Sequence, residues 1–233
     1  MDIIAKTRAD YNQIAAHFAA TRRGQESIRE LAKFAPFIQR GARILDWGCG
    51  NGRLLNLLKG KSVSYYGVDQ SLELLKIARR DWRAAIKAGR AHFFCTARRD
   101  KKFPVGFFDL VFAIASLHHL PDVKSRCAVL RKFFTALKPG ARLIITVWNL
   151  DSDWARAKYR MVRQKLAAHD YLIPWKNQQG ELMAWRYYHH FTQSELRRLL
   201  VQSGFKVTEM YYSLGNQRVA KRQARNLVAV ASK

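Results

Sequence analysis

The chain has 233 residues, of which 48% are hydrophobic and 12% are aromatic. This composition excludes a disordered chain, and the length suffices for one sizeable α/β domain. Its 42 Lys and Arg against 17 Asp and Glu give a net charge of +25, and no apolar run approaches the roughly 18 residues that a membrane span needs.

The positive charge favours a polyanionic partner, and nucleic acid comes first. An anionic membrane surface, or a genome rich in Lys and Arg, are the alternatives. The three cysteines are widely spaced, and MDIIAKTRAD contains an early acid and no apolar core of a signal peptide. We therefore expect a cytoplasmic protein with reduced thiols and no secretion signal.

Helix and strand patterns alternate along the chain. Residues 1–40 predict two helices that precede the sheet, and further helices are predicted at 53–60, 71–89, 122–140 (ended by Pro139-Gly140) and 192–205. Apolar and β-branched runs predict seven strands, at 42–50, 62–69, 91–97, 108–116, 141–149, 206–213 and 226–232. Strands joined by crossover helices form a mostly parallel sheet with helices on both faces, which binds ligands at the carboxyl ends of its strands.

The first candidate site is DWGCGNG, residues 46–52, between the first strand and a helix. Gly48, Gly50 and Gly52 let a ligand approach the backbone closely. A dinucleotide fingerprint would have a third glycine where this chain has Arg53, which weakens a nicotinamide interpretation. Asp46 precedes the glycines, and Asp69 ends the second strand, where a carboxylate can hold ribose hydroxyls. The pattern favours a nucleoside ligand over a simple tight turn with two surface acids.

A second candidate is YLIPWKNQQGELMAWRYYHHF, residues 171–191, which shows no clear helical or strand period. Aromatic faces and guanidinium planes grip unstacked RNA bases, and Lys and Arg bind phosphates. Trp175, Trp185, Tyr187, Tyr188, Lys176 and Arg186 supply both kinds of group. The alternative is that Trp185, Tyr188 and Phe191 are core aromatics under a long loop.

The motifs DWGCGNG, YYGVDQS, FDLVFAIASLHHL and LKPGARLIITVW, within residues 41–150, resemble those of class I S-adenosylmethionine-dependent methyltransferases. A narrower resemblance runs through YNQIAAHFAATR, SLHHL, LIPW, RYYHHF and YYSLGN. Together these segments are similar to the tRNA wobble-uridine methyltransferases that esterify 5-carboxymethyluridine. The resemblance implies a Rossmann-like fold, S-adenosylmethionine as cofactor and the anticodon stem-loop of a tRNA as partner, with no membrane or DNA partner. Some members of the family work with a small zinc-ribbon activator.

The resemblance also implies an organisation and a site. One methyltransferase domain covers 1–233: a helical cap (1–40), a cofactor-binding half (41–150), a substrate-side insert (151–191) and a C-terminal part (192–233). The cofactor-binding residues implied are Tyr11, Arg22, Asp46, Gly48, Gly50, Gly52, Asp69, Gln70, Thr96, Ser116 and His118. Those that position the substrate are His119, Trp175, Arg186, Tyr187 and His189. A substrate carboxylate, with a pKa near 4, is already ionised at neutral pH and needs no general base.

Several points stay open at this stage. Relatives usually carry an acid after the third strand, where this chain reads CTARR (residues 95–99), so adenine recognition falls to Thr96 or to the backbone. Adjacent His118 and His119 lack a third ligand at metal-binding spacing, so no metal is expected; the alternative role for His119 is to anchor a loop. The basic run 218–225 either grips RNA or is a solvated loop. A small-molecule methyltransferase and a non-catalytic RNA-binding protein on the same scaffold are the alternative functions.

Overall fold

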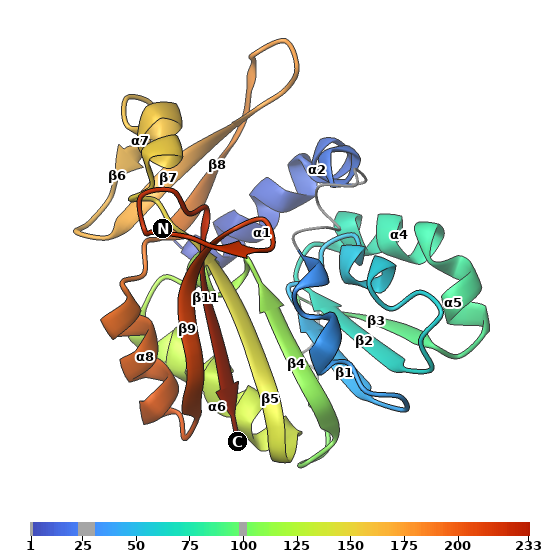
Figure 1. Ribbon diagram of the computed structural model, residues 1–233. Coiled ribbons are helices and arrows are strands. Elements are labelled where there is room, and N and C mark those ends of the chain that lie inside the picture. Colours follow the sequence, from blue (N-terminus) through green and yellow to red (C-terminus); the bar gives the residue numbers. More distant parts are fainter. Residues whose placement is uncertain (1, 23–30, 98–101) are drawn as a thin grey trace.

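The main sheet places five parallel strands beside an antiparallel pair. The computed structural model describes residues 2–22, 31–97 and 102–233. The strand order is β10-β9-β11-β5-β4-β1-β2-β3, in which neighbours from β3 to β5 run parallel and β11 runs antiparallel to both β5 and β9 (Figure 1). The strands are β1 (Arg43–Trp47), β2 (Ser64–Asp69), β3 (Ala91–Cys95), β4 (Phe108–Ile114), β5 (Leu137–Trp148), β9 (Lys206–Leu214), β10 (Gln217–Arg218) and β11 (Asn226–Ser232). The seven predicted strands are all present, and the two-residue β10 extends the edge.

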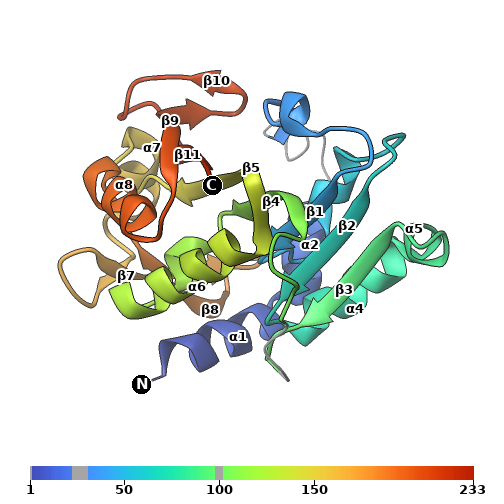
Figure 2. The same ribbon diagram turned by 90° about the horizontal axis from the view of Figure 1, so that it is seen from below.

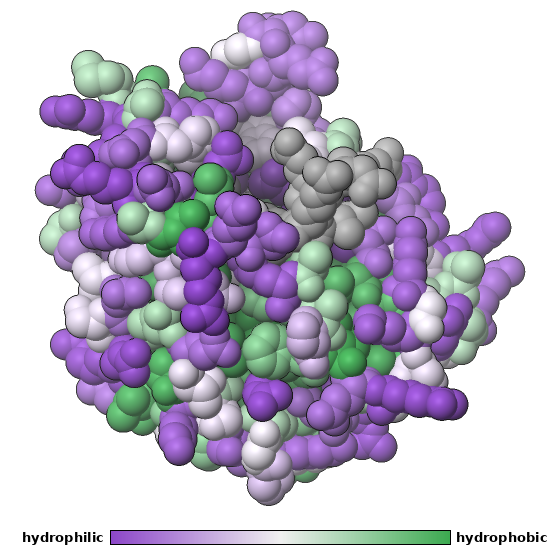
Figure 3. Space-filling model, in the orientation of Figure 1, coloured by the Kyte–Doolittle hydropathy of each residue, from purple (hydrophilic) through white to green (hydrophobic). Residues whose placement is uncertain are grey.

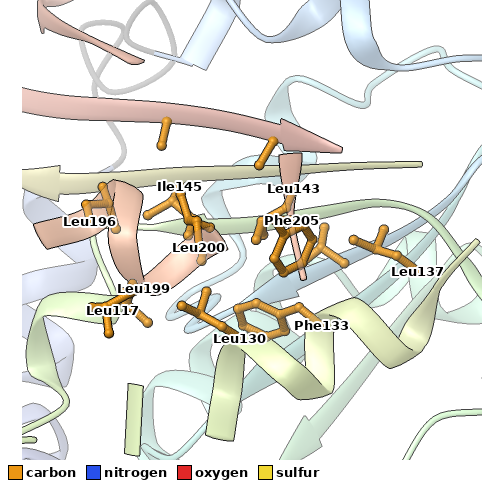
Figure 4. Close-up of a cluster of buried hydrophobic side chains, with 14 of the residues drawn as sticks. Leu117, Leu130, Phe133, Leu137, Leu143, Ile145, Leu196, Leu199, Leu200 and Phe205 are labelled. Atoms are coloured by element: carbon orange, nitrogen blue, oxygen red, sulfur yellow. The ribbon is translucent and has the colours of Figure 1, made fainter. Parts of the chain in front are cut away.

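Alternation along the strands gives the sheet two apolar faces. On one face, Val111 and Ile145 pack with α6 (Val123–Ala136) and α8 (Gln193–Gln202), and Figure 4 shows Leu130, Phe133 and Leu200 of this cluster. On the other face, residues of β1, β4 and β11 pack with α4 (Leu72–Asp81) and with residues 31–38. Burial of each large apolar side chain contributes about 1.5–3 kcal/mol, so both helical layers are fixed to the sheet.

Two further units lie beyond the carboxyl ends of the parallel strands. One is the pair α1 (Ile3–Gln13) and α2 (Ala15–Thr21); the other comprises α7 (Asp153–Tyr159) and a three-stranded antiparallel sheet of β6 (Gln164–Lys165), β7 (Asp170–Lys176) and β8 (Leu182–His189). Helix α1 contacts β8, and α2 contacts α4, so the N-terminal helices bridge the small sheet and the main one (Figures 1 and 2). These two units cover the end of the sheet at which ligands are expected to bind.

Residues 171–191, which show no clear helical or strand period in the sequence, form the β7–β8 hairpin, with a turn at Gly180 (φ +85°). Alternation of polar and apolar residues marks a strand only when one of its faces meets water. Strand β8 is covered on both faces, since Arg186, Tyr187, Tyr188 and His189 are all buried. Its polar residues therefore gave no periodic signal.

Three helix predictions differ in detail. The helix expected at 53–60 is only the 3-10 turn η2 (Arg53–Asn56), which follows Gly52 in a left-handed conformation (φ +74°). The helix expected at 71–89 divides at Trp82 into α4 and α5 (Arg83–Lys87), as the Trp82 indole N–H donates to the Asn51 carbonyl at 3.1 Å. Helix α6 ends at Ala136, and Pro139-Gly140 lies within β5 beside a register shift. The remaining short turns are η1 (Ala35–Phe37) and η3 (Leu117–His119). None of the helices in the described ranges is long and apolar enough to cross a bilayer.

Candidate functional site

A cavity of about 1410 Å³ opens at the carboxyl ends of β1, β2, β4 and β5. The glycine loop after β1 forms its base, and side chains from α1, α2, α7, β7 and β8 enclose it. The face of the protein drawn in Figure 3 is mostly hydrophilic, with hydrophobic residues in small separate areas. A large, partly apolar cavity at this end of a parallel sheet is the expected place for a ligand.

The glycine loop is held in a strained path by its neighbours. Gly48 has φ +74°, and a Cβ placed there would lie 2.5 Å from Cβ of Ser116. Ser116 is fixed in turn, because its hydroxyl donates to the Trp47 carbonyl at 2.9 Å and the preceding Ala115 has φ +52°. The loops after β1 and β4 therefore touch where only a glycine fits, which leaves their backbone open to the cavity.

Asp69 anchors the same loop from β2. Its Oδ2 accepts from the Gly50 amide and its Oδ1 from the Ser71 amide, both at 2.8 Å. Burial raises the pKa of this carboxyl, while the amide bonds oppose the rise. Asp69 lines the cavity with Gln70, Thr96 and Ser116, so a carboxylate with free lone pairs and several neutral polar groups face one space. This donor and acceptor set fits a nucleoside ligand with vicinal hydroxyls.

Asp46 and Gly52 are not among the residues that line the cavity. Asp46 points into the protein and accepts from the Tyr65 hydroxyl at 2.8 Å; burial raises the pKa of its carboxyl to about 7. A Cβ at Gly52 would lie 3.0 Å from the indole nitrogen of Trp82. Asp46 and Gly52 therefore support the glycine loop on the side that faces away from the cavity. Arg98 and Arg99, which follow the third strand, lie outside the described residues.

Arg186 is the dominant charge of the upper wall. Its side chain lines the cavity, only 1% of the residue is exposed, and the guanidinium lies over Trp175 at 4.6 Å and Tyr188 at 5.1 Å from the ring centroids. Nη1 donates to the hydroxyls of Tyr188 and, at 3.5 Å, Tyr11, whereas Nε has no partner. Among the described residues, no carboxylate forms an ion pair with this buried cation.

His119 orients Tyr11, one of the two tyrosines that Arg186 contacts. Its Nδ1 lies 2.7 Å from the Tyr187 carbonyl, to which it can only donate, so Nε2 carries no proton and accepts from the Tyr11 hydroxyl at 2.9 Å. Burial lowers the pKa of His119 to about 3, since the carbonyl contact only partly offsets it. His119 is therefore neutral at physiological pH. Because the Tyr11 hydroxyl donates its hydrogen bond to His119, its oxygen can only accept from Arg186.

The adjacent residues of β8 divide between two environments. Arg186 and Tyr188 line the cavity, whereas Tyr187 and His189 do not, because successive side chains of a strand point to opposite faces. The Tyr187 hydroxyl donates to Asp170 Oδ1 at 2.7 Å, and His189 bridges Asp170 at 2.6 Å and Glu195 at 2.8 Å. These two predicted substrate contacts hold the small sheet against the main one. The run RYYHHF suggested a single cluster, but the strand separates it.

His118 is likewise absent from the cavity lining. It is fully buried, its Nδ1 accepts from the Trp148 amide at 3.2 Å, and burial holds its pKa well below the usual value. No group of three or more possible metal ligands occurs within the described ranges of the chain.

The remaining predicted contacts line the cavity from the N-terminal side. The Trp175 indole donates to His17 Nδ1 at 2.9 Å, which joins β7 to α2. Arg22 lies 5.0 Å over the Phe18 ring, and burial, with Arg53 nearby, lowers its pKa. Together with Tyr11, these groups form one wall of the cavity.

The aromatic cavity residues that sequence reasoning missed include Trp148, Trp154 and Tyr159. Trp148 stacks on Tyr188 with ring centroids 4.8 Å apart. It ends β5, in the carboxyl-terminal position that commonly faces a ligand, and this was the available signal. Trp154 and Tyr159 lie on α7, a helix not predicted.

A profile of the family described as "Methyltransferase domain" matches residues 18–210. The chain is similar to the tRNA (carboxymethyluridine(34)-5-O)-methyltransferase of Schizosaccharomyces pombe, at 27% identity over 88% of this chain and 91% of that protein. It is also similar to the protein of that name, alkbh8, in Xenopus tropicalis, at 29% identity over 66% of this chain. The match spans only 23% of the Xenopus protein. A further relative, the O-methyltransferase rstn1 of Aspergillus nomiae, is 33% identical over 48% of this chain and 49% of its own length.

Solved structures share the fold. An S-adenosylmethionine-dependent methyltransferase from Methanosarcina mazei superposes with a TM-score of 0.65 at 25% identity, covering 85% of this chain and 95% of that one. The putative methyltransferase in complex with the Trm112 activator from Haloferax volcanii gives 0.63 at 17% identity, covering 95% and 96%. The predicted Rossmann-like α/β fold is confirmed.

Proposed function

The chain belongs to the methyltransferase-domain family, whose cofactor is S-adenosylmethionine, and from that premise we propose that it methylates the carboxylate of a modified wobble uridine in tRNA. The product is the methyl ester of a 5-carboxymethyluridine-type base. The similarity to the S. pombe enzyme over most of both chains supports this assignment. The site geometry supports it independently.

The observation that carries the proposal is the unpaired charge of Arg186. A guanidinium that is 1% exposed and has no carboxylate partner among the residues that the structure describes is costly to bury unless a ligand supplies the anion. Two tyrosine hydroxyls accept from Nη1, and the guanidinium still lines the cavity, where an anionic ligand can approach it. A carboxylate matches this cation in charge and accepts charge-assisted hydrogen bonds from it. Hydroxyl or amine acceptors would leave the cation uncompensated.

The cofactor, when bound, supplies a methyl group on a sulfonium, which an oxygen nucleophile attacks as the bond to sulfur breaks. Asp69 and the loop at Gly48–Gly50 are positioned to hold its nucleoside part. Arg186 holds the substrate carboxylate, and Tyr11 and His119 keep Arg186 in place. The substrate carboxylate is already ionised, so the reaction needs no general base, and His119 has no proton to remove. The work of the site is orientation and exclusion of water.

A tRNA substrate also accounts for the net charge of +25 and for the aromatic side chains around Arg186. An unstacked base requires flat apolar faces, and the flanking phosphates require cations. The structural neighbour that binds Trm112 leads us to include a zinc-ribbon activator as a partner in the proposal. Assays therefore need to be run with and without it.

The decisive test is transfer of labelled methyl from S-adenosylmethionine to total tRNA from a strain that lacks the gene, followed by nucleoside mass spectrometry. We expect label in a wobble uridine, in a bond that mild alkali cleaves. Unlabelled tRNA under every modification state, with and without activator, would contradict the proposal. If calorimetry then still showed cofactor binding, the small-molecule alternative would gain support, as the similarity to rstn1 suggests. Absence of cofactor binding would favour a non-catalytic RNA-binding protein.

The pH dependence of methyl transfer separates a carboxylate acceptor from a phenol or an amine. Asp46, whose pKa burial raises to about 7, lies behind the cofactor loop, so S-adenosylmethionine is kept saturating to cancel any effect of its titration on cofactor binding. With the pKa of His119 lowered to about 3 and a substrate pKa near 4, neither His119 nor the acceptor changes charge between about pH 6 and 9. We expect kcat/KM to vary less than about twofold over this range. An acceptor that must lose a proton would instead give a rate that rises about tenfold per pH unit below its pKa. Measurement of initial rates at constant ionic strength distinguishes the two.

A further inference from the structure

Four aromatic rings form a continuous path from the protein surface to Arg186. Trp154 contacts Tyr159 at 5.6 Å between ring centroids, Tyr159 stacks with Trp148 at 6.3 Å, and Trp148 stacks with Tyr188 at 4.8 Å. All four rings line the cavity. We call this set the aromatic lane. Its inner end, Tyr188, touches Arg186, and its outer end, Trp154, is only partly buried on α7.

Two exposed cations flank the outer end of the aromatic lane. Lys158 lies 5.2 Å from the centroid of the Trp154 ring, and the Arg225 guanidinium lies 4.6 Å from it. Neither has an acidic partner among the described residues. Their neighbours differ: Lys221 and Arg156 both pair with Asp151, at 2.7 and 3.5 Å. Lys158 and Arg225 therefore keep their charge available for a ligand at the mouth of the cavity.

We propose that Trp154, Lys158 and Arg225 bind the single-stranded RNA next to the target nucleotide, an inference that rests on the proposed function. The flexible side chains of Lys158 and Arg225 move off the Trp154 ring to contact the flanking phosphates, and a neighbouring base stacks on the ring face that they leave. The target base then extends along the aromatic lane to Arg186. This places the RNA on the side of α7 and of the loop that precedes β11 (Figure 1).

The combination of groups favours RNA over other polyanions. A protein or membrane partner of opposite charge would satisfy the two cations but would not need an aromatic ring that both cations contact and that continues inward as an aromatic path. Stacking of a base on an aromatic side chain contributes about 1–3 kcal/mol. Each phosphate contact with a single strand adds about 0.7 to the slope of log affinity against log salt.

The test is binding of a fluorescently labelled anticodon stem-loop RNA, followed by anisotropy across a salt series. The variant Lys158→Gln/Arg225→Gln is compared with Lys87→Gln/Arg90→Gln, which removes the same charge from exposed residues at the end of α5 and in the turn before β3, neither of which lines the cavity. We expect the first variant to bind at least about tenfold more weakly, with the salt slope lower by about 1.4, and the control to match the wild type. Trp154→Ala should weaken binding about 5- to 150-fold with an unchanged slope.

Equal affinity and slope for both double variants would overturn the inference, as would normal binding by Trp154→Ala. Because the readout is RNA binding, it does not depend on methyl transfer. If the wild type binds RNA through these residues but never methylates it, the proposed function fails and the surface stands. If it methylates tRNA and the variants bind normally, the surface fails and the function stands. Thermal melting of each variant excludes loss of fold as the cause.

Discussion

Arg186→Met is expected to remove methyl transfer while leaving the fold intact. The guanidinium holds the substrate carboxylate by charge-assisted bonds in a buried site, and loss of one partner of such a pair costs about 2–5 kcal/mol. We therefore expect kcat/KM to fall about 30- to 5,000-fold. The free energy of unfolding should rise or hardly change, because the wild type already bears the cost of a buried cation that has no acidic partner within residues 2–22, 31–97 and 102–233.

A loss of activity without a loss of stability distinguishes a substrate-binding role for Arg186 from a structural one. Urea unfolding should place Arg186→Met within about 1 kcal/mol of the wild type or above it, and calorimetry should show unchanged affinity for S-adenosylmethionine. Arg186→Lys keeps the charge but loses the flat bidentate edge, so its activity should fall between the two. A variant that loses several kcal/mol of stability, or that loses cofactor binding equally, would show that Arg186 is a structural residue.

Gly48→Ala is expected to weaken both the fold and cofactor binding. The residue has φ +74°, which costs alanine about 1 kcal/mol, and the new Cβ would lie 2.5 Å from Cβ of Ser116. Relief of that overlap must separate the loops after β1 and β4, at a further cost of about 1–3 kcal/mol. The free energy of unfolding should fall by about 2–4 kcal/mol, and the affinity for S-adenosylmethionine should fall with it.

Gly60→Ala supplies the matched control. Gly60 has nearly the same φ, +73°, but nothing lies within 4 Å of a Cβ added there. The free energy of unfolding of Gly60→Ala should fall only by the conformational cost of about 1 kcal/mol, and the variant should bind the cofactor normally. Equal losses in the two variants would mean that contact with Ser116 does not restrict the loop.

The cavity also shows why the substrate side is harder to predict than the cofactor side. The glycine loop and Asp69 follow directly from local sequence, because closely spaced glycines after a strand permit the positive-φ turn and the close approach of a ligand that such a loop needs. The substrate wall instead combines Tyr11, Trp148 and Arg186, which come from three elements far apart in the chain. Their juxtaposition depends on how α1 and the small sheet pack above the main one.

The sequence by itself determined the positions of the seven strands along the chain, the cofactor loop and the family, since apolar periodicity and glycine spacing act within a few residues. The tertiary structure decided which side chains of the insert face the cavity. A strand covered on both faces has no polarity pattern, so only its position shows that Arg186 and Tyr188 point inward while Tyr187 and His189 point away. The tertiary structure also decided that Arg186 pairs with no acid in the described part of the chain, because pairing of charges depends on distances in space between residues that are distant in the chain.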